Sequence, residues 1–325
     1  MRLVVVLSNV AAASPTHTTI HLLAAALARG AAVRVVEPGD LELDERGRLQ
    51  LRAFVLDDHP PDRQALAETL RTRAAPRRTV EALSHDVMVL RVNPIDTAVV
   101  ALAQLAQRAG LCVRNDPDAL FRTTHKSWIA SLPPDVPKPT TVVTRSLATA
   151  QQFASVHGTV VVKPGRACGG RGVALCRGPG ADLADGFSAA LEAGDGWVVV
   201  QRYLAAAVEG EKRLLWLDGQ VVGGYRRQRP PGEFRHNLKL GGVPEACDVD
   251  DADHAALAAL GPHLAREGVW FAGVDLIGGN VVEVNVLNPG GAHFTTELAG
   301  VAVGEALVAS LAAGVTSRGA PRPRS

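Results

Sequence analysis

Strand patterns alternate with helix patterns over the first 120 residues, and this alternation limits the fold more than any other feature. "RLVVVLSNV" is followed by "TTIHLLAAALARGAAVRVVEPGDLEL", and later by "HDVMVLRV", "DTAVVALAQLAQRAG" and "LCVRN". Gly30 stands where the first helix is expected to end, since glycine readily takes the left-handed conformation found there. Strands that alternate with helices of this length predict a parallel sheet with helices on its faces.

The rest of the chain has a different pattern. A proline-rich connector, "SLPPDVPKPTTVVT", leads into short strands and helices, and the last part is rich in strands with hairpin turns at Asp218-Gly219 and Gly278-Gly279. A chain of 325 residues exceeds what one core usually organises. We therefore expect an α/β protein divided into an N-terminal parallel-sheet domain, a small central lid domain, a C-terminal antiparallel domain and a disordered tail, over residues 1–122, 123–202, 203–315 and 316–325.

Composition and charge exclude several classes of partner. Hydrophobic residues make up 47% and the formal net charge is +1, which is typical of a globular protein and gives no electrostatic reason to expect nucleic acid or a membrane surface as partner. The apolar run in "MRLVVVLSNV" is too short for a signal peptide or a membrane span, so we expect the cytoplasm. The four cysteines lack metal-ligand spacing, and only Cys168, within a glycine loop, is left open for a functional contact.

That loop, "VVKPGRACGGRGVALCR", indicates phosphate binding. Glycines let backbone N–H groups converge on an anion, and Lys163 at the end of the preceding strand adds a point charge. The sequence fits neither of the two best-known nucleotide loops, and a plain surface hairpin is the alternative.

Two carboxylates and an amide predict a metal site further along the chain. In "GVDLIGGNVVEVNVLNPGG", Glu283 and Asn285 point to one face of a strand, and a hairpin brings Asp275 beside them. Hard oxygen donors of this kind suit Mg²⁺, with Mn²⁺ as a second possibility. The alternative is a hydrogen-bonded strand pair in which Asp275 forms a salt bridge.

These motifs occur in an order that resembles the ATP-grasp superfamily. Within it the chain is similar to bacterial glutathione synthetase almost from end to end: "RNDPDALFRTTHKSW", "VVKPGRACGGRGV", "GVWFAGVDLIG" and "VEVNV" match segments of that family. So does the long stretch "YLAAAVEGEKRLLWLDGQVVGGYRRQRPPGEFRHNLKLGG", which in the family includes a flexible loop over the nucleotide. The resemblance implies an ATP-grasp fold, ATP as co-substrate and magnesium.

The resemblance also implies roles for individual residues. The lysines and glycines implied to hold the ATP phosphates are Lys126, Lys163, Gly169, Gly170 and Gly172. Those implied for adenine and ribose are Gln201, Tyr203, Leu204 and Glu211, and those for magnesium are Asp275, Glu283 and Asn285. Arg213 and Arg227 are implied to face the phosphate and acyl end, and Arg235 with Asn237 to complete the catalytic site from the loop.

The implied reaction is ATP-dependent ligation of a carboxylate to an amine through an acyl phosphate. Glutathione synthesis from γ-glutamylcysteine and glycine is the leading hypothesis. A related ligase for another acid and amine is the first alternative, and a nucleotide-binding scaffold like synapsin is the second. Small amino acids or peptides are the expected substrates, and relatives imply a homo-oligomer.

The substrate segments depart from the family's pattern. Arg91 is retained and is a candidate anchor for a substrate carboxylate, with a salt bridge to a nearby acid as the alternative, but Val92 and Asn93 replace the family's lysine and aspartate. The family's serine-proline is replaced by "NPGGAHFTTELAG". Its candidate substrate residues are Asn288, Gly290 and Gly291. These departures leave the acid and amine undecided. A functional contact of His236, in the predicted loop, is also left open.

Overall fold

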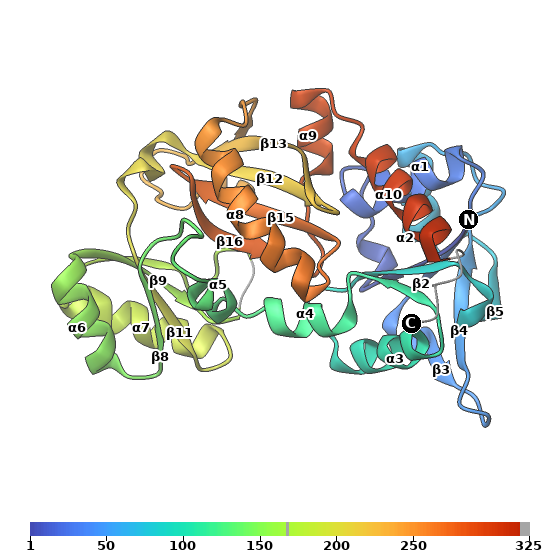
Figure 1. The fold of residues 1–325 in the computed structure, drawn as a ribbon, viewed down its shortest axis with the longest axis horizontal. Helices are drawn as coiled ribbons and strands as arrows, with labels where there is room; N and C mark the ends of the chain where they lie inside the picture. Colours follow the sequence, from blue (N-terminus) through green and yellow to red (C-terminus); the bar gives the residue numbers. More distant parts are fainter. Residues whose placement is uncertain (167–168, 319–325) are drawn as a thin grey trace, which may run out of the picture.

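The computed structural model describes residues 1–166 and 169–318. In this part of the chain the strands form three sheets, which lie side by side along the long axis of the molecule (Figure 1). The C-terminal sheet lies between the central sheet and the N-terminal sheet. Cys168, for which a functional contact was left open, lies outside the described residues.

The N-terminal sheet has seven strands. They are β1 (Arg2–Leu7), β2 (Ala32–Val36), β3 (Leu41–Leu43), β4 (Leu49–Val55), β5 (Arg77–Glu81), β6 (Val87–Arg91) and β7 (Cys112–Arg114). The order is β3-β4-β2-β1-β6-β7, with β5 beside β4. Strands β2, β1, β6 and β7 are parallel, which confirms the predicted parallel sheet. The antiparallel extension by β3, β4 and β5 was not predicted.

Helices cover both faces of the N-terminal sheet. They are α1 (Thr18–Ala28), α2 (Arg63–Arg71) and α3 (Thr97–Arg108). The side chains of β1 alternate between two cores: Val4 and Val6 face the core that includes α3, and Leu3 and Val5 face the core that includes α1 and α2. Gly30 follows Arg29, the C-cap residue of α1, and has φ +68°, as expected for the end of this helix.

The central sheet is antiparallel and has a core of its own. Its strands are β8 (Thr141–Thr144), β9 (Thr159–Pro164), β10 (Ala174–Arg177) and β11 (Val198–Arg202), in the order β10-β9-β11-β8. Helices α6 (Leu147–His157) and α7 (Ala181–Ala193) pack on one face through residues such as Ala150 and Phe187. The short helices α4 (Pro117–Thr123) and α5 (Ser127–Ser131) precede this sheet along the chain.

The C-terminal sheet is antiparallel in the order β14-β13-β12-β15-β16. Its strands are β12 (Glu211–Leu217), β13 (Gln220–Gln228), β14 (Val243–Glu245), β15 (Phe271–Ile277) and β16 (Asn280–Asn285). The predicted turns at Asp218-Gly219 and Gly278-Gly279 join β12 to β13 and β15 to β16, and all four residues have positive φ. Helix α8 (Asp251–Glu267) packs on one face of this sheet. The other face is divided between apolar residues such as Leu215 and Phe271, which belong to the core that includes α1, and polar residues such as Arg213.

The chain ends with α9 (Ala292–Ala299) and α10 (Val303–Arg318). Helix α10 packs against α1, with Arg29 Nε 2.7 Å from Glu305 Oε2, so the end of the chain joins the N-terminal sheet (Figure 1). Helix α10 extends three residues into the segment 316–325 predicted to be a disordered tail, and residues 319–325 lie outside the described part. The proposed domain boundaries stay a prediction.

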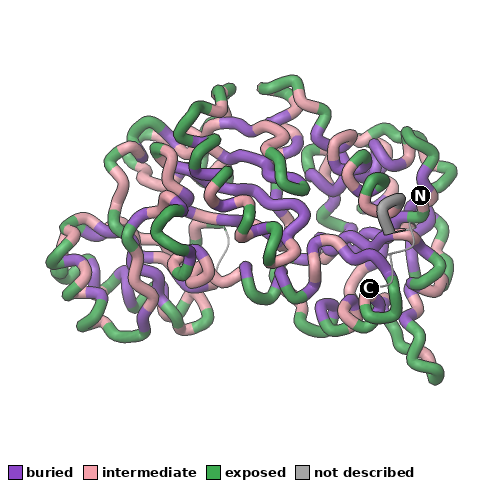
Figure 2. Tube along the Cα trace, viewed as in Figure 1, coloured by how far each residue is buried: buried purple, intermediate pink, exposed green. Residues whose placement is uncertain are grey.

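Among the described residues, no single helix is both long enough and apolar enough to cross a membrane. Helix α9 and residues 303–315 pass that test only as a pair, bent by 117°. Figure 2 shows the buried segments concentrated in the strands of the sheets, with exposed segments at the periphery.

Asn115 ties the N-terminal sheet to the C-terminal sheet. Its side chain is buried, with 4% of the residue exposed, directly after β7. Asn115 Oδ1 accepts from the backbone N–H groups of Trp270 and Phe271 at 2.7 Å each, and Nδ2 donates to the carbonyls of Phe271 and Val286 at 2.9 Å each. One amide therefore satisfies four buried backbone groups at the ends of β15 and β16.

We expect Asn115→Ala to lower the free energy of unfolding by roughly 2–4 kcal/mol, because it leaves buried backbone groups without partners. Urea unfolding followed by circular dichroism and tryptophan fluorescence measures the change. Gln152→Ala, which removes an exposed amide from α6, is the control and should shift the value by less than about 0.5 kcal/mol. Equal effects of the two substitutions would show that the buried amide is not a link between the sheets.

Candidate functional site

A cavity of about 390 Å³ lies between the polar face of the C-terminal sheet and the central sheet. Most of the predicted site residues line it. They are Lys126, Lys163, Gly169, Gly170, Gln201, Tyr203, Leu204, Glu211, Arg213, Arg227, Arg235, Asn237, Asp275, Glu283, Asn285, Asn288 and Gly290. Side chains that are far apart in the sequence therefore surround one space.

Three predicted residues do not line this cavity. Gly172 has φ +68°, and a Cβ there would lie 2.7 Å from Ala193 Cβ, so the turn and its packing explain the glycine. Gly291 has φ +124° and packs against Tyr225. Arg91 is only 4% exposed. Its guanidinium donates to Thr19 Oγ1 at 3.1 Å and to the carbonyl of Pro289 at 2.9 Å.

Arg91 is therefore held by neutral oxygens. Within the described residues it has no carboxylate within 4.0 Å, so the salt bridge considered as its alternative does not form. Burial lowers the pKa of Arg91 to about 9. Through Pro289 it supports the backbone beside Asn288 and Gly290, both of which line the cavity.

The two predicted phosphate lysines reach the cavity from different elements. Lys163 extends from the middle of the central sheet, and its Nζ donates to Gln201 Oε1 at 2.9 Å. Burial lowers the pKa of Lys163, although the charge of Glu283 opposes this shift. Lys126 precedes α5, and its Nζ lies 3.6 Å from Glu283 Oε1. Both ammonium groups thus lie near the predicted metal residues.

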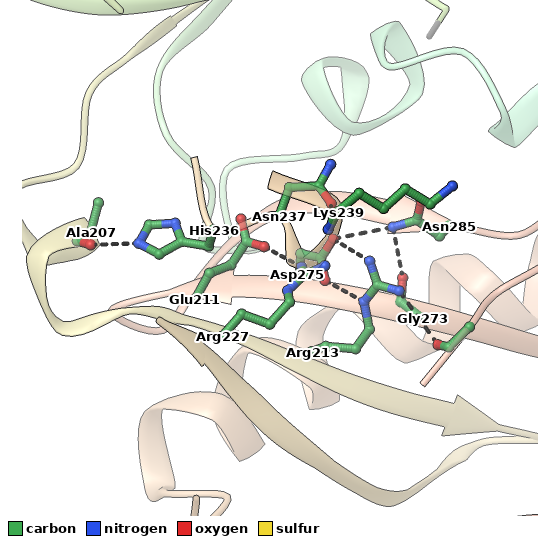
Figure 3. A network of polar contacts seen from close by, with 11 residues as sticks. Ala207, Glu211, Arg213, Arg227, His236, Asn237, Lys239, Gly273, Asp275 and Asn285 are labelled. Atoms are coloured by element: carbon green, nitrogen blue, oxygen red, sulfur yellow. Dashed lines mark hydrogen bonds and ion pairs between the residues drawn. The ribbon is translucent and has the colours of Figure 1, made fainter. Parts of the chain in front are cut away.

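Strand register produces the charged network on the C-terminal sheet. Arg213 on β12 pairs with Asp275 on β15, Asp275 pairs in turn with Glu283 on β16, and Glu211 on β12 pairs with Arg227 on β13. The guanidinium of Arg213 holds both oxygens of Asp275, with Nη2 2.7 Å from Oδ2. Arg227 Nη2 lies 2.6 Å from Asp275 Oδ1 and also contacts Glu211 (Figure 3).

The environment shifts the pKa values of the two buried acids in opposite directions. Burial opposes ionisation of Asp275, but the contacts with Arg213 and Arg227 outweigh it, so the pKa of this carboxyl is below its ordinary value. Burial is the largest effect on Glu211 and raises its pKa to about 7, against the opposing charge of Arg227. Asp275 is therefore anionic at neutral pH, while Glu211 titrates near it.

The residues predicted for a metal fit magnesium. Asp275, Glu283 and Asn285 provide hard oxygen atoms on adjacent strands, and few protein ligands leave room for phosphate oxygens and water. Asn285 Nδ2 donates to Asp275 Oδ2 at 3.2 Å, which turns its amide oxygen away from that carboxylate. No group of three or more histidine, cysteine or acidic side chains within residues 1–166 and 169–318 is arranged to hold an ion. Asp275 forms the salt bridges that the alternative interpretation expected, with Arg213 and Arg227.

Two loops meet over the cavity. Arg235 Nη1 donates to the carbonyl of Gly170 at 3.1 Å, and a Cβ on Gly170 would lie 3.4 Å from Asn237 Nδ2. His236 is 5% exposed, and its Nε2 donates to the carbonyl of Ala207 at 2.8 Å (Figure 3). His236 therefore fixes the base of the loop between β13 and β14, and burial keeps its pKa below the ordinary value.

Further residues, to which the sequence had assigned no definite role, also line the cavity. They are Asn93, Val161, Pro164, Arg171, Val173, Arg202, Ala207, Phe234, His236, Lys239, Ile277, Val282 and Pro289. Lys239 follows Asn237 by two positions and Arg171 lies within the glycine loop, so proximity to recognised motifs was the available signal for both.

Family models cover almost the whole described chain. The model of the prokaryotic glutathione synthetase N-terminal domain matches residues 1–121, and that of the prokaryotic glutathione synthetase ATP-grasp domain matches residues 126–300. The chain belongs to the prokaryotic glutathione synthetase family. It is an ATP-dependent carbon–nitrogen ligase with an ATP-grasp fold, as the motifs predicted.

Individual relatives agree with this assignment. The glutathione synthetase of Prochlorococcus marinus strain MIT 9313 is 38% identical over 65% of this chain and 68% of the relative. That of Synechococcus elongatus is 29% identical over 96% of this chain and 98% of the relative. One similar solved structure is that of the ATP-grasp ligase PsnB, complexed with a phosphomimetic variant of its minimal precursor, Mg and ADP. Its TM-score is 0.61 at 20% sequence identity, and the match covers 96% of this chain and 98% of PsnB. At this identity the last comparison supports the fold alone.

Together with the ribose role that the resemblance implies for Glu211, its raised pKa predicts a pH dependence of nucleotide binding. The carboxyl is neutral below about pH 7 and anionic above it, and an anionic acceptor binds hydroxyl groups more strongly than a neutral one. We expect affinity for Mg-ATP to fall as pH decreases from 8 to 6, and Glu211→Gln to bind about 10-fold more weakly at pH 8 without that part of the pH dependence.

Calorimetric titration across this pH range measures both effects. Because the nucleotide itself titrates, the difference between wild type and Glu211→Gln isolates the protein group. Glu209→Gln, an exposed neighbour that does not line the cavity, is the control and should follow the wild type. Parallel pH profiles of Mg-ATP affinity for wild type and Glu211→Gln would contradict the role of Glu211 in nucleotide binding.

Proposed function

We propose that this ligase is a glutathione synthetase, which joins γ-glutamylcysteine to glycine with hydrolysis of ATP to ADP and phosphate. The observation that carries the proposal is the convergence of Lys126, Lys163 and the Asp275–Glu283–Asn285 set on one cavity of a chain in this family. The identity of the two substrates is inferred from the names of the relatives and from the resemblance of the motifs to that family. The cytoplasm and a homo-oligomer remain expectations.

We infer the nucleotide position from the linings of the cavity. Adenine lies against the segment Gln201–Leu204, its ribose faces Glu211, and its phosphates extend towards Lys163 and Lys126. Asp275, Glu283 and Asn285 would hold Mg²⁺, which when bound neutralises charge on the phosphate oxygens. The loop contact between Arg235 and Gly170 covers the cavity and excludes water, which would hydrolyse an acyl phosphate.

The chemical step requires charge stabilisation more than proton transfer. The carboxylate of the acid attacks the γ-phosphorus of ATP, the bond to the β-phosphate oxygen breaks, and ADP leaves. The amine then attacks the acyl carbon, and phosphate leaves as a tetrahedral intermediate collapses. Arg213 and Arg227, fixed by Asp275, and the two lysines stabilise the negative charge of the transferring group.

A ligase for a different acid and amine is the second candidate. Asn93 and Asn288 line the cavity at the positions where the sequence departs from the family's pattern, so the surface that meets the substrates differs there. A nucleotide-binding scaffold would bind ATP without turnover that depends on an acid and an amine.

The first experiment measures ADP release with Mg-ATP, γ-glutamylcysteine and glycine, and identifies the product by mass spectrometry. Glutathione formed at enzymatic rates supports the proposal. ADP release that responds only to another acid and amine supports the second candidate. ADP release at background with every acid and amine, while ATP still binds, supports the scaffold.

We expect Glu283→Gln to lower ADP release by at least about 100-fold, because it removes one of two anionic metal ligands. The fold should be retained, since the Glu283 side chain is one third exposed and its ion pair with Lys126 is long at 3.6 Å. A coupled ADP assay and a thermal melt measure the two effects. Glu192→Gln on α7, exposed and remote from the cavity lining, should leave both unchanged. Full activity of Glu283→Gln would contradict the role of Glu283 as a metal ligand.

A further inference from the structure

A second cavity of about 210 Å³ adjoins the first and has no assigned ligand. Six residues line both cavities: Asn93, Lys126, Arg171, Glu283, Asn285 and Asn288. Its volume is below the roughly 300–1,000 Å³ of sites for larger ligands, so it suits a molecule the size of an amino acid or a very short peptide. The two cavities meet where the proposed function places the γ-phosphate.

The second cavity carries an excess of positive charge. Lys126, Arg166 and Arg171 line it, against the single acid Glu283. Since Glu283 pairs with Lys126, the two guanidinium groups are left unmatched. Across the described ranges, 1–166 and 169–318, no carboxylate lies within 4.0 Å of either arginine. A cavity of this charge attracts an anionic ligand.

An aromatic contact holds Arg166 in place, while its Nε has no hydrogen-bond partner within residues 1–166 and 169–318. Its guanidinium carbon lies 5.7 Å from the centre of the Phe121 ring, a stacking contact that limits its movement. Its Nε is buried and unpaired among the described residues. Asp195 pairs instead with His125, with 3.2 Å between Oδ2 and Nε2. A ligand in the second cavity that accepts from this donor would satisfy it.

We propose that Arg166 binds a second carboxylate of the acid substrate, the one that is not phosphorylated. This inference rests on the proposed function, which puts the reacting carboxylate beside Lys126 and Glu283 at the junction of the cavities. Arg166 lines only the second cavity, so it faces the acid and not the nucleotide. Arg166 thereby distinguishes acids that carry this second carboxylate, as γ-glutamylcysteine does, from monocarboxylic acids, which bind more weakly. Arg171 lines both cavities, so its charge faces both the acid and the nucleotide side.

The test compares two ligands and two variants. The ligands are γ-glutamylcysteine and the same molecule with its glutamyl α-carboxylate converted to an amide. Each is titrated by calorimetry into wild type, Arg166→Gln and Arg177→Gln, all saturated with Mg²⁺ and a non-hydrolysable ATP analogue. Arg177 is an exposed arginine at the end of β10 outside both linings, so its substitution removes the same charge without the proposed contact.

We expect wild type and Arg177→Gln to prefer the dicarboxylate by about 10-fold, and Arg166→Gln to bind both ligands equally. Affinity for the ATP analogue should be the same in all three proteins. An unchanged preference in Arg166→Gln, the absence of any preference or of measurable binding in wild type, or an equal loss of affinity for the ATP analogue would overturn the inference. Binding needs no turnover, so an inactive protein that keeps the Arg166-dependent preference would contradict the proposed function alone.

Discussion

The carboxylate of Asp275 is the charge around which the site is arranged. It is 2% exposed on a sheet whose other face is packed with apolar side chains, and an unpaired anion there would be strongly destabilising. Arg213 and Arg227 compensate for it from β12 and β13. Because each arginine then has its position fixed by the same carboxylate, the cations that face the cavity are oriented before any ligand binds, and little reorganisation accompanies phosphoryl transfer.

That arrangement creates a competition for Asp275. Both of its oxygens accept from guanidinium groups, and Asn285 Nδ2 donates to one of them. A metal that uses Asp275 as a ligand has to share these oxygens with the arginines. The side chain of Glu283 is instead one third exposed, and its ion pair with Lys126 is long, at 3.6 Å. Glu283 is therefore the acid whose removal affects metal binding with the least effect on the fold. Asp275 serves the fold and the site together.

The parts of this architecture that are local in the sequence could be predicted from it. The Gly278-Gly279 turn and the alternation in β16 placed Asp275, Glu283 and Asn285 together, since both signals lie within 11 residues. The register of β12 against β15 joins positions more than 60 residues apart, and only tertiary structure reveals that Arg213 faces Asp275. Strand β5, "RRTVE", has no alternating apolar pattern because it lies at the edge of the sheet, so its pairing with β4 left no signal. The burial of Arg91 and the anchoring of His236 depend on long-range packing in the same way.

The shared wall of the two cavities follows from what the reaction must bring together. Phosphoryl transfer requires two anions, the γ-phosphate and the acid, to approach closely, and two like unit charges about 4 Å apart repel by roughly 4 kcal/mol at an effective dielectric constant near 20. Lys126 and Arg171 lie in that wall, so positive charge is concentrated where the repulsion is greatest. Glu283, also in the wall, would increase the repulsion if it were uncompensated. Its pairing with Lys126, and its proposed use as a metal ligand, turn the one acid at the junction into part of the charge that holds the two reactants together.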